Sequence, residues 1–389
     1  MRPGQREILI ISAYGLALSI STQMLYSQLA LYMKYELKTG ECKIALLDGF
    51  VEFVSYIVRI LAGILSDYMH NRRLLMAIGC GVLCMVKPIF ALSQSVAQVL
   101  WAEIAERLGN GVQACPRDAM ISDWSSRERL AASFGFFKSM KTVGALLGAT
   151  SATIILGHWD YRTLFWCAGI PALASASLLL AMRDAPANGH EKSACNPFRK
   201  KYLRSLKGRF WIILLLAATC ELSHFGESLL TLRASTLIPQ RFAGMTAVFM
   251  ALGPALLAYP MGLAADRRGK IPLLRLCLRL SICAYVCLLL SDSAWTLFGA
   301  VMILCGQQAS MQSIFLALIG ECVDKNLRAT AIGMFYGVIG GSYLMASGIC
   351  GKLWEIHGHE AAFIYGAAMS TLGLTAVGFF RTRLEASRQ

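Results

Sequence analysis

Ionisable side chains recur inside long apolar stretches of this chain, where a charge needs a partner or a task. The first series is Asp48, Glu52, Ser55 and Arg59, at steps of four, three and four residues. This spacing places all four side chains on one face of a helix. Carboxylates and a guanidinium on one face could take up protons or bind a charged solute. We therefore expect this face to point away from apolar surroundings.

Cationic residues form a second group in the same half of the sequence. Arg107 lies in an apolar stretch one helical turn after Glu103, which is the spacing of an ion pair. Lys138 and Lys141 lie in the next apolar stretch. Together the three cations predict a cavity surface that favours an anionic solute. Lys87 could instead extend its amine outward to the nearest polar boundary.

A third group of polar residues occupies two apolar stretches of the second half. Its members are Glu221, His224 and Glu227, expected close to one face of the seventh stretch, and Gln307 and Gln308 in the tenth. A carboxylate whose neighbours change between two conformations can load and release a proton. We expect Glu221, with His224 or Glu52, to be that proton site. The alternative for each residue is that these charges neutralise one another and only hold helices together.

The elements that must position these residues are long apolar segments. Of the 389 residues, 56% are hydrophobic and only 15% are charged, whereas soluble proteins are about 25% charged. A membrane span needs about 20 mostly apolar residues. Twelve such segments begin near positions 8, 44, 74, 97, 131, 161, 211, 243, 271, 295, 329 and 360. The sequence therefore predicts an all-α membrane protein with about 12 transmembrane helices, the first of which is retained rather than cleaved as a signal peptide.

The net charge of +14 would suit a nucleic-acid partner if it were gathered on one surface. Most of the 37 Lys and Arg residues fall instead in the termini, the central loop and alternate short loops. The positive-inside rule then places both termini in the cytoplasm. We expect the protein to lie in a bacterial inner membrane. The basic loops would lie beside anionic lipid head groups, and no nucleic-acid partner is expected.

The chain repeats itself about its midpoint. Gly63 and Gly262 are 199 residues apart, and so are Asp67 and Asp266. The only long polar stretch, 183–210, lies between the two copies. We expect a six-helix bundle over 1–182, a basic cytoplasmic linker over 183–210 and a second, pseudo-symmetric six-helix bundle over 211–389.

Two loops between apolar segments carry a pattern of glycine, aspartate and basic residues. The first copy holds Gly63, Asp67, Arg72 and Arg73, and the second holds Gly262, Asp266, Arg267, Gly269 and Lys270. Together with the run Arg107-Leu108-Gly109-Asn110-Gly111, these loops resemble signatures of bacterial permeases of the major facilitator superfamily. The resemblance implies two bundles that rock around a central site, with the two loops acting as a cytoplasmic gate.

These features favour a secondary transporter of a small anionic organic solute, such as an organic acid or a carboxylate siderophore, coupled to protons. The sequence contains no G-x-x-x-x-G-K-(S/T) phosphate loop, catalytic triad or metal-ligand cluster, so we expect no enzymatic activity, cofactor or metal. One alternative is a multidrug efflux antiporter, although Gly148-Ala149 lacks the proline that such antiporters usually carry there. Another is a membrane sensor that does not transport. The resemblance also implies a monomer.

Overall fold

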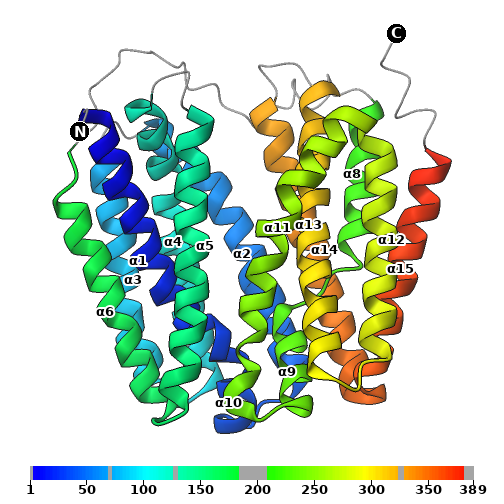
Figure 1. Cartoon of the computed structure of the whole chain (residues 1–389), viewed down its shortest axis with the longest axis horizontal. Helices are drawn as coiled ribbons and strands as arrows, with labels where there is room; N and C mark the ends of the chain where they lie inside the picture. Colours follow the sequence, from blue (N-terminus) through cyan, green and yellow to red (C-terminus); the bar gives the residue numbers. More distant parts are fainter. Residues whose placement is uncertain (1–2, 69–71, 126–129, 184–207, 323–327, 381–389) are drawn as a thin grey trace. The chain divides into compact units, whose positions relative to one another are not determined.

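The computed structural model describes residues 3–68, 72–125, 130–183, 208–322 and 328–380, which are almost entirely helical (Figure 1). The first half contains α1 (Pro3–Leu31), the π-helical turn η1 (Tyr32–Glu36), α2 (Glu41–Tyr68), α3 (Arg72–Leu92), α4 (Val96–Trp124), α5 (Leu130–Leu156) and α6 (Tyr161–Leu180). The second half contains α8 (Gly208–Glu221), α9 (Glu227–Leu237), α10 (Gln240–Ala243), α11 (Thr246–Arg268), α12 (Lys270–Leu289), α13 (Ala294–Cys322), α14 (Arg328–His357) and α15 (His359–Phe379). The predicted all-α fold is confirmed, because each of the twelve apolar segments is helical. The seventh differs in being divided between α8 and α9.

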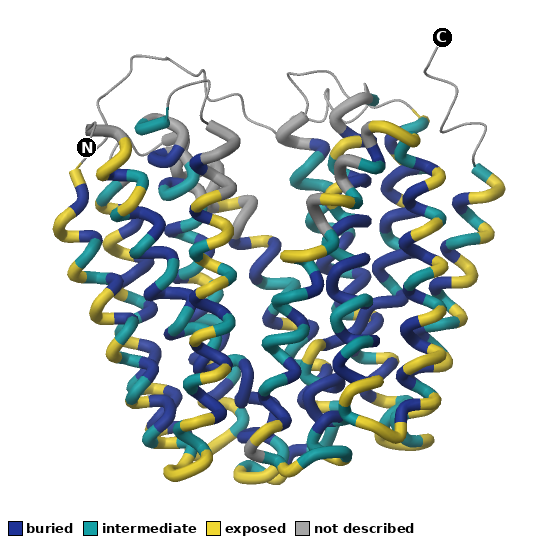
Figure 2. Tube along the Cα trace, in the orientation of Figure 1, coloured by how far each residue is buried: buried dark blue, intermediate teal, exposed yellow. Residues whose placement is uncertain are grey.

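Large apolar side chains lie exposed along the outer helices. On α6, Trp166, Ile170 and Leu173 are all more than half exposed and recur at helical spacing. Figure 2 shows exposed positions repeating along α6 and α15. Eight of the described helical segments are long and apolar enough to cross a membrane. An exposed surface of this kind suits contact with lipid.

Contacts among the residues divide the chain into two compact units. Unit 1 comprises Met1–Thr39, Val54–Ala194 and Pro239–Val248. Within it, α1 packs against α5 and α6, and α3 packs against α4 and α6. Glycines allow two of these crossings: a Cβ on Gly79 would lie 2.7 Å from the carbonyl oxygen of Gly109, and one on Gly144 would lie 2.5 Å from that of Leu16. Small residues therefore bring these backbones into direct contact.

Unit 2 comprises Gly40–Phe53, Cys195–Ile238 and Phe249–Gln389. Here α12 packs against α13 and α15, and α14 packs against α15 and α8. α11 and α13 approach through glycine, because a Cβ on Gly306 would lie 2.7 Å from the carbonyl oxygen of Gly253. This core holds the polar residues of the seventh and tenth apolar segments.

Each unit includes a short segment from the other half of the sequence. Gly40–Phe53 belongs to unit 2 and Pro239–Val248 belongs to unit 1. Their first residues are 199 positions apart, which is the offset of the sequence repeat. The predicted bundle boundaries at 182 and 211 remain a prediction, and most of the predicted linker, 184–207, lies outside the described residues.

Asp160 shows how one helix of unit 1 begins. It has extended backbone angles directly before α6, and its Oδ1 accepts hydrogen bonds from the backbone N–H and the hydroxyl of Thr163. Such a cap satisfies a backbone donor that the first helical turn leaves unpaired. The hydrogen bond from the Thr163 hydroxyl, followed by that from its N–H, holds the pKa of the exposed Asp160 carboxyl below its usual value.

Replacement of Asp160 by Ala is expected to lower the free energy of unfolding by about 0.5–2 kcal/mol, because one cap is lost. Since the pKa is lowered on folding, the ionised cap contributes fully above the unfolded value of about 3.9 and is lost as pH falls through the folded value. Thermal unfolding in detergent at neutral and acidic pH measures both effects. Asp160→Asn keeps the acceptor without the charge, so its stability should vary less with pH. Equal stability of native protein and Asp160→Ala at neutral pH would contradict the capping role.

Candidate functional site

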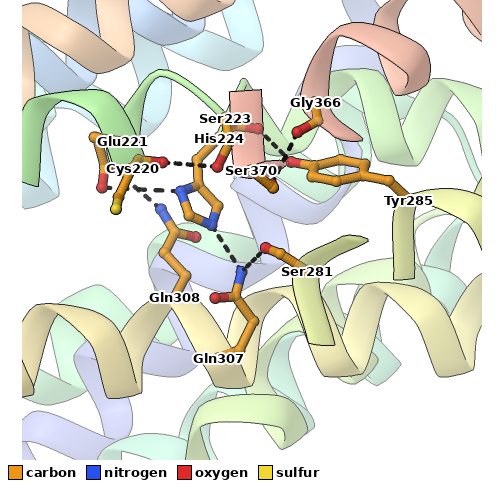
Figure 3. A network of polar contacts seen from close by, with 10 residues as sticks. All are labelled: Cys220, Glu221, Ser223, His224, Ser281, Tyr285, Gln307, Gln308, Gly366 and Ser370. Carbon is orange, nitrogen blue, oxygen red and sulfur yellow. Dashed lines mark hydrogen bonds and ion pairs between the residues drawn. The ribbon is translucent and has the colours of Figure 1, made fainter. Parts of the chain in front are cut away.

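The seventh apolar segment is interrupted where its polar residues lie. α8 ends at Glu221, residues 222–226 are not helical, and α9 begins at Glu227. The prediction that Glu221, His224 and Glu227 share one helical face is therefore wrong. The backbone carbonyl of Ser223, freed by the break, accepts a hydrogen bond from the hydroxyl of Tyr285 on α12 (Figure 3). Such interruptions occur in membranes only where protein or a polar cavity satisfies the freed backbone groups.

Asp48 of α2 stabilises the second part of the break. α9 has Gly226 at its N-cap position, which has no side chain to accept from the helix. The Oδ2 atom of Asp48 fills that role by accepting a hydrogen bond of 3.2 Å from the backbone N–H of Ser228. A Cβ on Gly226 would lie 2.5 Å from this oxygen. The carboxylate thus lies at the positive end of the α9 dipole, and glycine makes room for it.

Glu221 and His224 meet two glutamines of α13 in the core of unit 2 (Figure 3). The amide nitrogen of Gln307 lies 2.8 Å from Nε2 of His224 and 2.7 Å from the Ser281 hydroxyl on α12. The amide nitrogen of Gln308 donates to Glu221 Oε1 at 3.3 Å. The other carboxylate oxygen of Glu221 is 3.9 Å from Nδ1 of His224. Four of the predicted site residues therefore form one polar cluster.

This cluster is buried among the helices of unit 2. Glu221 is 5% exposed, His224 is 4% exposed and Gln307 is fully buried. Glu52 of α2 lies close enough to Glu221 to interact with it electrostatically. Glu227, in contrast, is exposed at the start of α9. A buried carboxylate beside a histidine and amides is equipped to take up and release a proton.

In unit 1, Arg107 of α4 lies against α1. Its guanidinium carbon is 4.7 Å from the centre of the Tyr26 ring, within range of a cation–π interaction. Glu103 is buried on the same helix, and its pairing with Arg107 remains a prediction.

The motif glycines that follow Arg107 have packing roles. Gly109 approaches Gly79 of α3, and Gly111 approaches Val58 of α2. The side chain of Arg59 lies outside the described residues.

Lys87 forms an ion pair that the sequence did not reveal. Its amine is 2.7 Å from Oε1 of Glu106 on α4, and both side chains are fully buried. The alternative that Lys87 extends outward is therefore wrong. Glu106 is not among the predicted site residues, because its partner lies on another helix and spacing along one helix reveals only pairs within that helix. The signal in the sequence was a carboxylate, Glu106, and an amine, Lys87, in neighbouring apolar segments, each without an evident partner in its own segment.

Lys138 and Lys141 of α5 are both exposed, but on a different side from the apolar surface of that helix. Leu147 is nine residues, or two and a half helical turns, after Lys138 and therefore points the opposite way. Leu147, Val143 and Ile154 form the exposed apolar side. On the side of α5 that carries the lysines, the Ser19 hydroxyl of α1 donates a hydrogen bond to the Lys141 carbonyl oxygen at 2.8 Å. α5 thus presents an apolar face and a separate cationic face.

The predicted gate loops are described in part. Gly63, Asp67, Gly262 and Asp266 lie in the helical ends of α2 and α11, and Arg72 begins α3, but their side chains lie outside the described residues. Arg73 donates to the carbonyl oxygen of Leu180 at 2.8 Å, which satisfies the C-terminal end of α6. In the second copy, Arg267 is exposed in the last turn of α11, Gly269 has φ of +94° and Lys270 starts α12. Only glycine adopts that angle without strain, which explains its place in the motif.

Comparisons with known proteins match most of the chain. The sequence model described as the Major Facilitator Superfamily matches residues 11–240 and 222–389. An uncharacterised MFS-type transporter of Methanocaldococcus jannaschii is 26% identical over 346 residues, which cover 86% of this chain and 84% of that protein.

Solved structures show the same fold at low sequence identity. The nucleoside transporter NupG has a TM-score of 0.78 at 13% identity, covering 96% of this chain and 99% of its own. A transporter of the POT family in complex with a thioalcohol-conjugated peptide has a TM-score of 0.80 at 12% identity, covering 98% and 97%. The human organic anion transporter MFSD10 has a TM-score of 0.63 at 13% identity, covering 97% and 100%. The chain therefore belongs to the Major Facilitator Superfamily and is an integral membrane transporter of a small molecule, not an enzyme.

Proposed function

We propose that this protein moves a small organic anion, such as an organic acid or a carboxylate siderophore, and couples that movement to protons. The observation that carries the choice of an anion is the cationic face of α5. Lys138 and Lys141 are exposed on a side of the helix that its apolar residues do not share. A lysine amine in a membrane is costly unless it faces water, a partner or a ligand.

Arg107 supplies a further cation in the same unit. Its stacking on Tyr26 holds the guanidinium in place, and a guanidinium can bind a carboxylate through two parallel hydrogen bonds. We assign substrate recognition to Arg107, Lys138 and Lys141 and the coupling proton to Glu221. The buried cluster of Glu221, His224, Gln307 and Gln308 supports the proton assignment.

The similar structures do not choose among substrates. By their names they include a nucleoside transporter, a POT family transporter with a bound peptide conjugate and an organic anion transporter, and such low identity carries the fold alone. The anion proposal therefore rests on the charged residues of this chain.

We propose in addition that both termini lie in the cytoplasm of a bacterial inner membrane, since the basic residues gather in the termini and alternate loops. The two glycine–aspartate loops would then form the cytoplasmic gate, with the positive φ of Gly269 fixing the turn between α11 and α12. We also propose that the protein acts as a monomer, by analogy with other transporters of this superfamily.

A transport screen tests the anion assignment. Purified protein in liposomes is offered a panel of organic acids, carboxylate siderophores and cationic drugs under an imposed pH gradient, and accumulation is followed by mass spectrometry. We expect accumulation of one or more carboxylates. Lys138→Ala and Lys141→Ala should each raise KM for that solute about 10- to 100-fold, because a charge-assisted hydrogen bond contributes about 1.5–3 kcal/mol.

Two controls define the meaning of that screen. Lys43→Ala removes another exposed lysine, at the start of α2, and should leave KM unchanged. Lys141→Arg keeps the charge and should recover most of the affinity. Accumulation of cationic drugs alone would overturn the anion proposal in favour of multidrug efflux. If carboxylates accumulate with unchanged KM in both alanine variants, the recognition site lies elsewhere.

A further inference from the structure

The hydrogen bonds of Gln307 determine which nitrogen of His224 carries the proton. The Gln307 amide nitrogen contacts both His224 Nε2, at 2.8 Å, and the Ser281 hydroxyl, at 2.7 Å (Figure 3). An amide nitrogen only donates, and its two hydrogens are thus both used. Nε2 must therefore be the acceptor. A neutral imidazole then carries its single hydrogen on Nδ1, the nitrogen that faces Glu221 at 3.9 Å.

The same three side chains fit a second arrangement. If the Gln307 amide turns over, its oxygen takes the central position and accepts hydrogen bonds from Nε2–H of His224 and from the Ser281 hydroxyl. Ser281 serves both arrangements because a hydroxyl either donates or accepts. Two buried atoms without a hydrogen bond among the described residues, Nδ1 of His224 and Oε1 of Gln307, show that the first arrangement leaves polar groups unsatisfied. The first arrangement leaves the Gln307 oxygen without a hydrogen bond among the described residues, and the second would leave the Gln307 amide hydrogens without one.

The two arrangements present opposite groups to Glu221. In the first, Nδ1–H points toward the carboxylate and favours its ionised form. In the second, Nδ1 presents a lone pair, which can accept a hydrogen bond from a protonated carboxyl group. The distance of 3.9 Å is too long for a hydrogen bond, so a small movement in the non-helical segment 222–226 must close it in either case.

We propose that Gln307 is a positioning residue that links the tautomer of His224 to the protonation of Glu221. This proposal rests on the proposed proton coupling and deepens it. A hydronium ion gives a proton to Nε2 of His224, Nδ1–H passes its proton to the Glu221 carboxylate, and water is left. The ring stays neutral overall, Glu221 becomes neutral, and the Gln307 amide turns over to accept from the new Nε2–H. Release of the proton reverses each step.

Other titratable groups lie around this cluster, and the effects of their protonation must be distinguished from that of Glu221. They are Cys220 on α8, Glu52 on α2, Glu227 on α9, Cys277 and Tyr285 on α12, Cys305 on α13, Cys350 on α14 and Tyr365 on α15. Glu52 lies within electrostatic range of Glu221, so a change in its protonation would act on the same carboxylate. Glu52→Gln removes that contribution and leaves the contacts of Gln307 with His224 and Ser281 in place.

Nitrogen-15 NMR of histidine tests the proposal without any solute. The protein is labelled at both imidazole nitrogens, placed in lipid bilayers and titrated, and the His224 signals are those that vanish in His224→Asn. At high pH we expect the protonated signal at Nδ1 and the unprotonated one at Nε2. As Glu221 takes up its proton, the protonated signal should move to Nε2 and the unprotonated signal to Nδ1. In Glu221→Gln the exchange should be absent, whereas in Glu52→Gln it should remain.

Substitutions of Gln307 make the test specific. The ionised side chain of Gln307→Glu offers only acceptors, so His224 should carry a proton on Nε2 at high pH. Gln307→Met has a similar shape without hydrogen bonds and should lose the preference for Nδ1–H at high pH. Gln308→Met is the matched control, since Gln308 contacts Glu221 and not the imidazole, and should keep Nδ1–H at high pH.

Retention of Nδ1–H in Gln307→Met, or an Nε2–H tautomer in the native protein at high pH, would overturn the proposal. If Gln307→Glu fails to fold, the comparison of Gln307→Met with Gln308→Met carries the test. Because the tautomer is measured without transport, a failure here leaves proton-coupled anion transport standing. A failure of transport coupling leaves the tautomer assignment standing in turn.

Discussion

Replacement of Lys87 by Met should lower the free energy of unfolding by roughly 3–5 kcal/mol, the cost of leaving a buried carboxylate without its partner. Both Lys87 and Glu106 are fully buried, and the amine lies 2.7 Å from the carboxylate. A carboxylate that is buried without a partner carries a large desolvation cost. Thermal unfolding of purified protein in detergent, with the yield of folded protein as a second readout, measures the effect.

The double variant Lys87→Met/Glu106→Met separates a paired charge from a general packing defect. Replacing both members of a buried ion pair by apolar residues is often neutral or stabilising, so most of the lost stability should return. Lys352→Met, at an exposed lysine of α14, should change stability by less than about 0.5 kcal/mol. A double variant as unstable as Lys87→Met would contradict the account of the pair.

Replacement of Glu221 by Gln should abolish accumulation driven by a pH gradient while solute exchange across the membrane continues. The glutamine keeps the shape of the side chain and can still hydrogen-bond to Gln308, but it cannot bind a proton. Exchange of internal for external solute requires no net proton movement, so its rate should stay within a few-fold of the native rate. Parallel uptake and exchange assays in liposomes of the same preparation measure both quantities.

Glu360→Gln is the matched control for this prediction, because Glu360 is exposed in the first turn of α15. It should retain both accumulation and exchange. Undiminished gradient-driven accumulation in Glu221→Gln would place the coupling proton elsewhere, with Glu52 as the next candidate. Loss of both activities would indicate that Glu221 binds the solute or supports the break between α8 and α9.

The fold was predictable because membrane spans have a strong sequence signal. In lipid, backbone N–H and C=O groups must form hydrogen bonds within the protein. A long apolar segment that spans the membrane is therefore expected to be a helix, which satisfies its own backbone groups. The repeat at an offset of 199 residues was also visible, and the segments Gly40–Phe53 and Pro239–Val248 begin at that same offset. Which unit each of these segments joins was not visible, because that depends on packing between helices distant in sequence.

The polar cluster of unit 2 was predictable in composition but not in geometry. Glu221, His224, Gln307 and Gln308 stand out as polar residues in apolar segments. The break at 222–226 was missed because the average apolar character of the seventh segment outweighed Gly226 and the polar residues around it. Ser281 also contributes through its hydroxyl, yet a lone serine in a helix carries no sequence signal, since it commonly bonds to its own backbone.

The charges of unit 1 show a similar limit. Spacing within a helix favours a pair between Glu103 and Arg107, which stays a prediction. The structure shows in addition a pair between Glu106 and Lys87 on another helix and places Arg107 on Tyr26. Pairing within one helix can be read from periodicity. Pairing between helices depends on their rotation, which a single sequence does not contain.

The central claim, that anion movement is coupled to protons, is tested most directly by the internal pH of liposomes. Native protein is reconstituted around a trapped pH-sensitive dye without an imposed gradient, and a carboxylate found in the transport screen is added outside. We expect a change of internal pH that depends on the carboxylate, is absent from protein-free liposomes and disappears in Glu221→Gln. Uptake of the carboxylate with no protein-dependent change of internal pH would contradict proton coupling, and the assignment of Glu221 would fall with it.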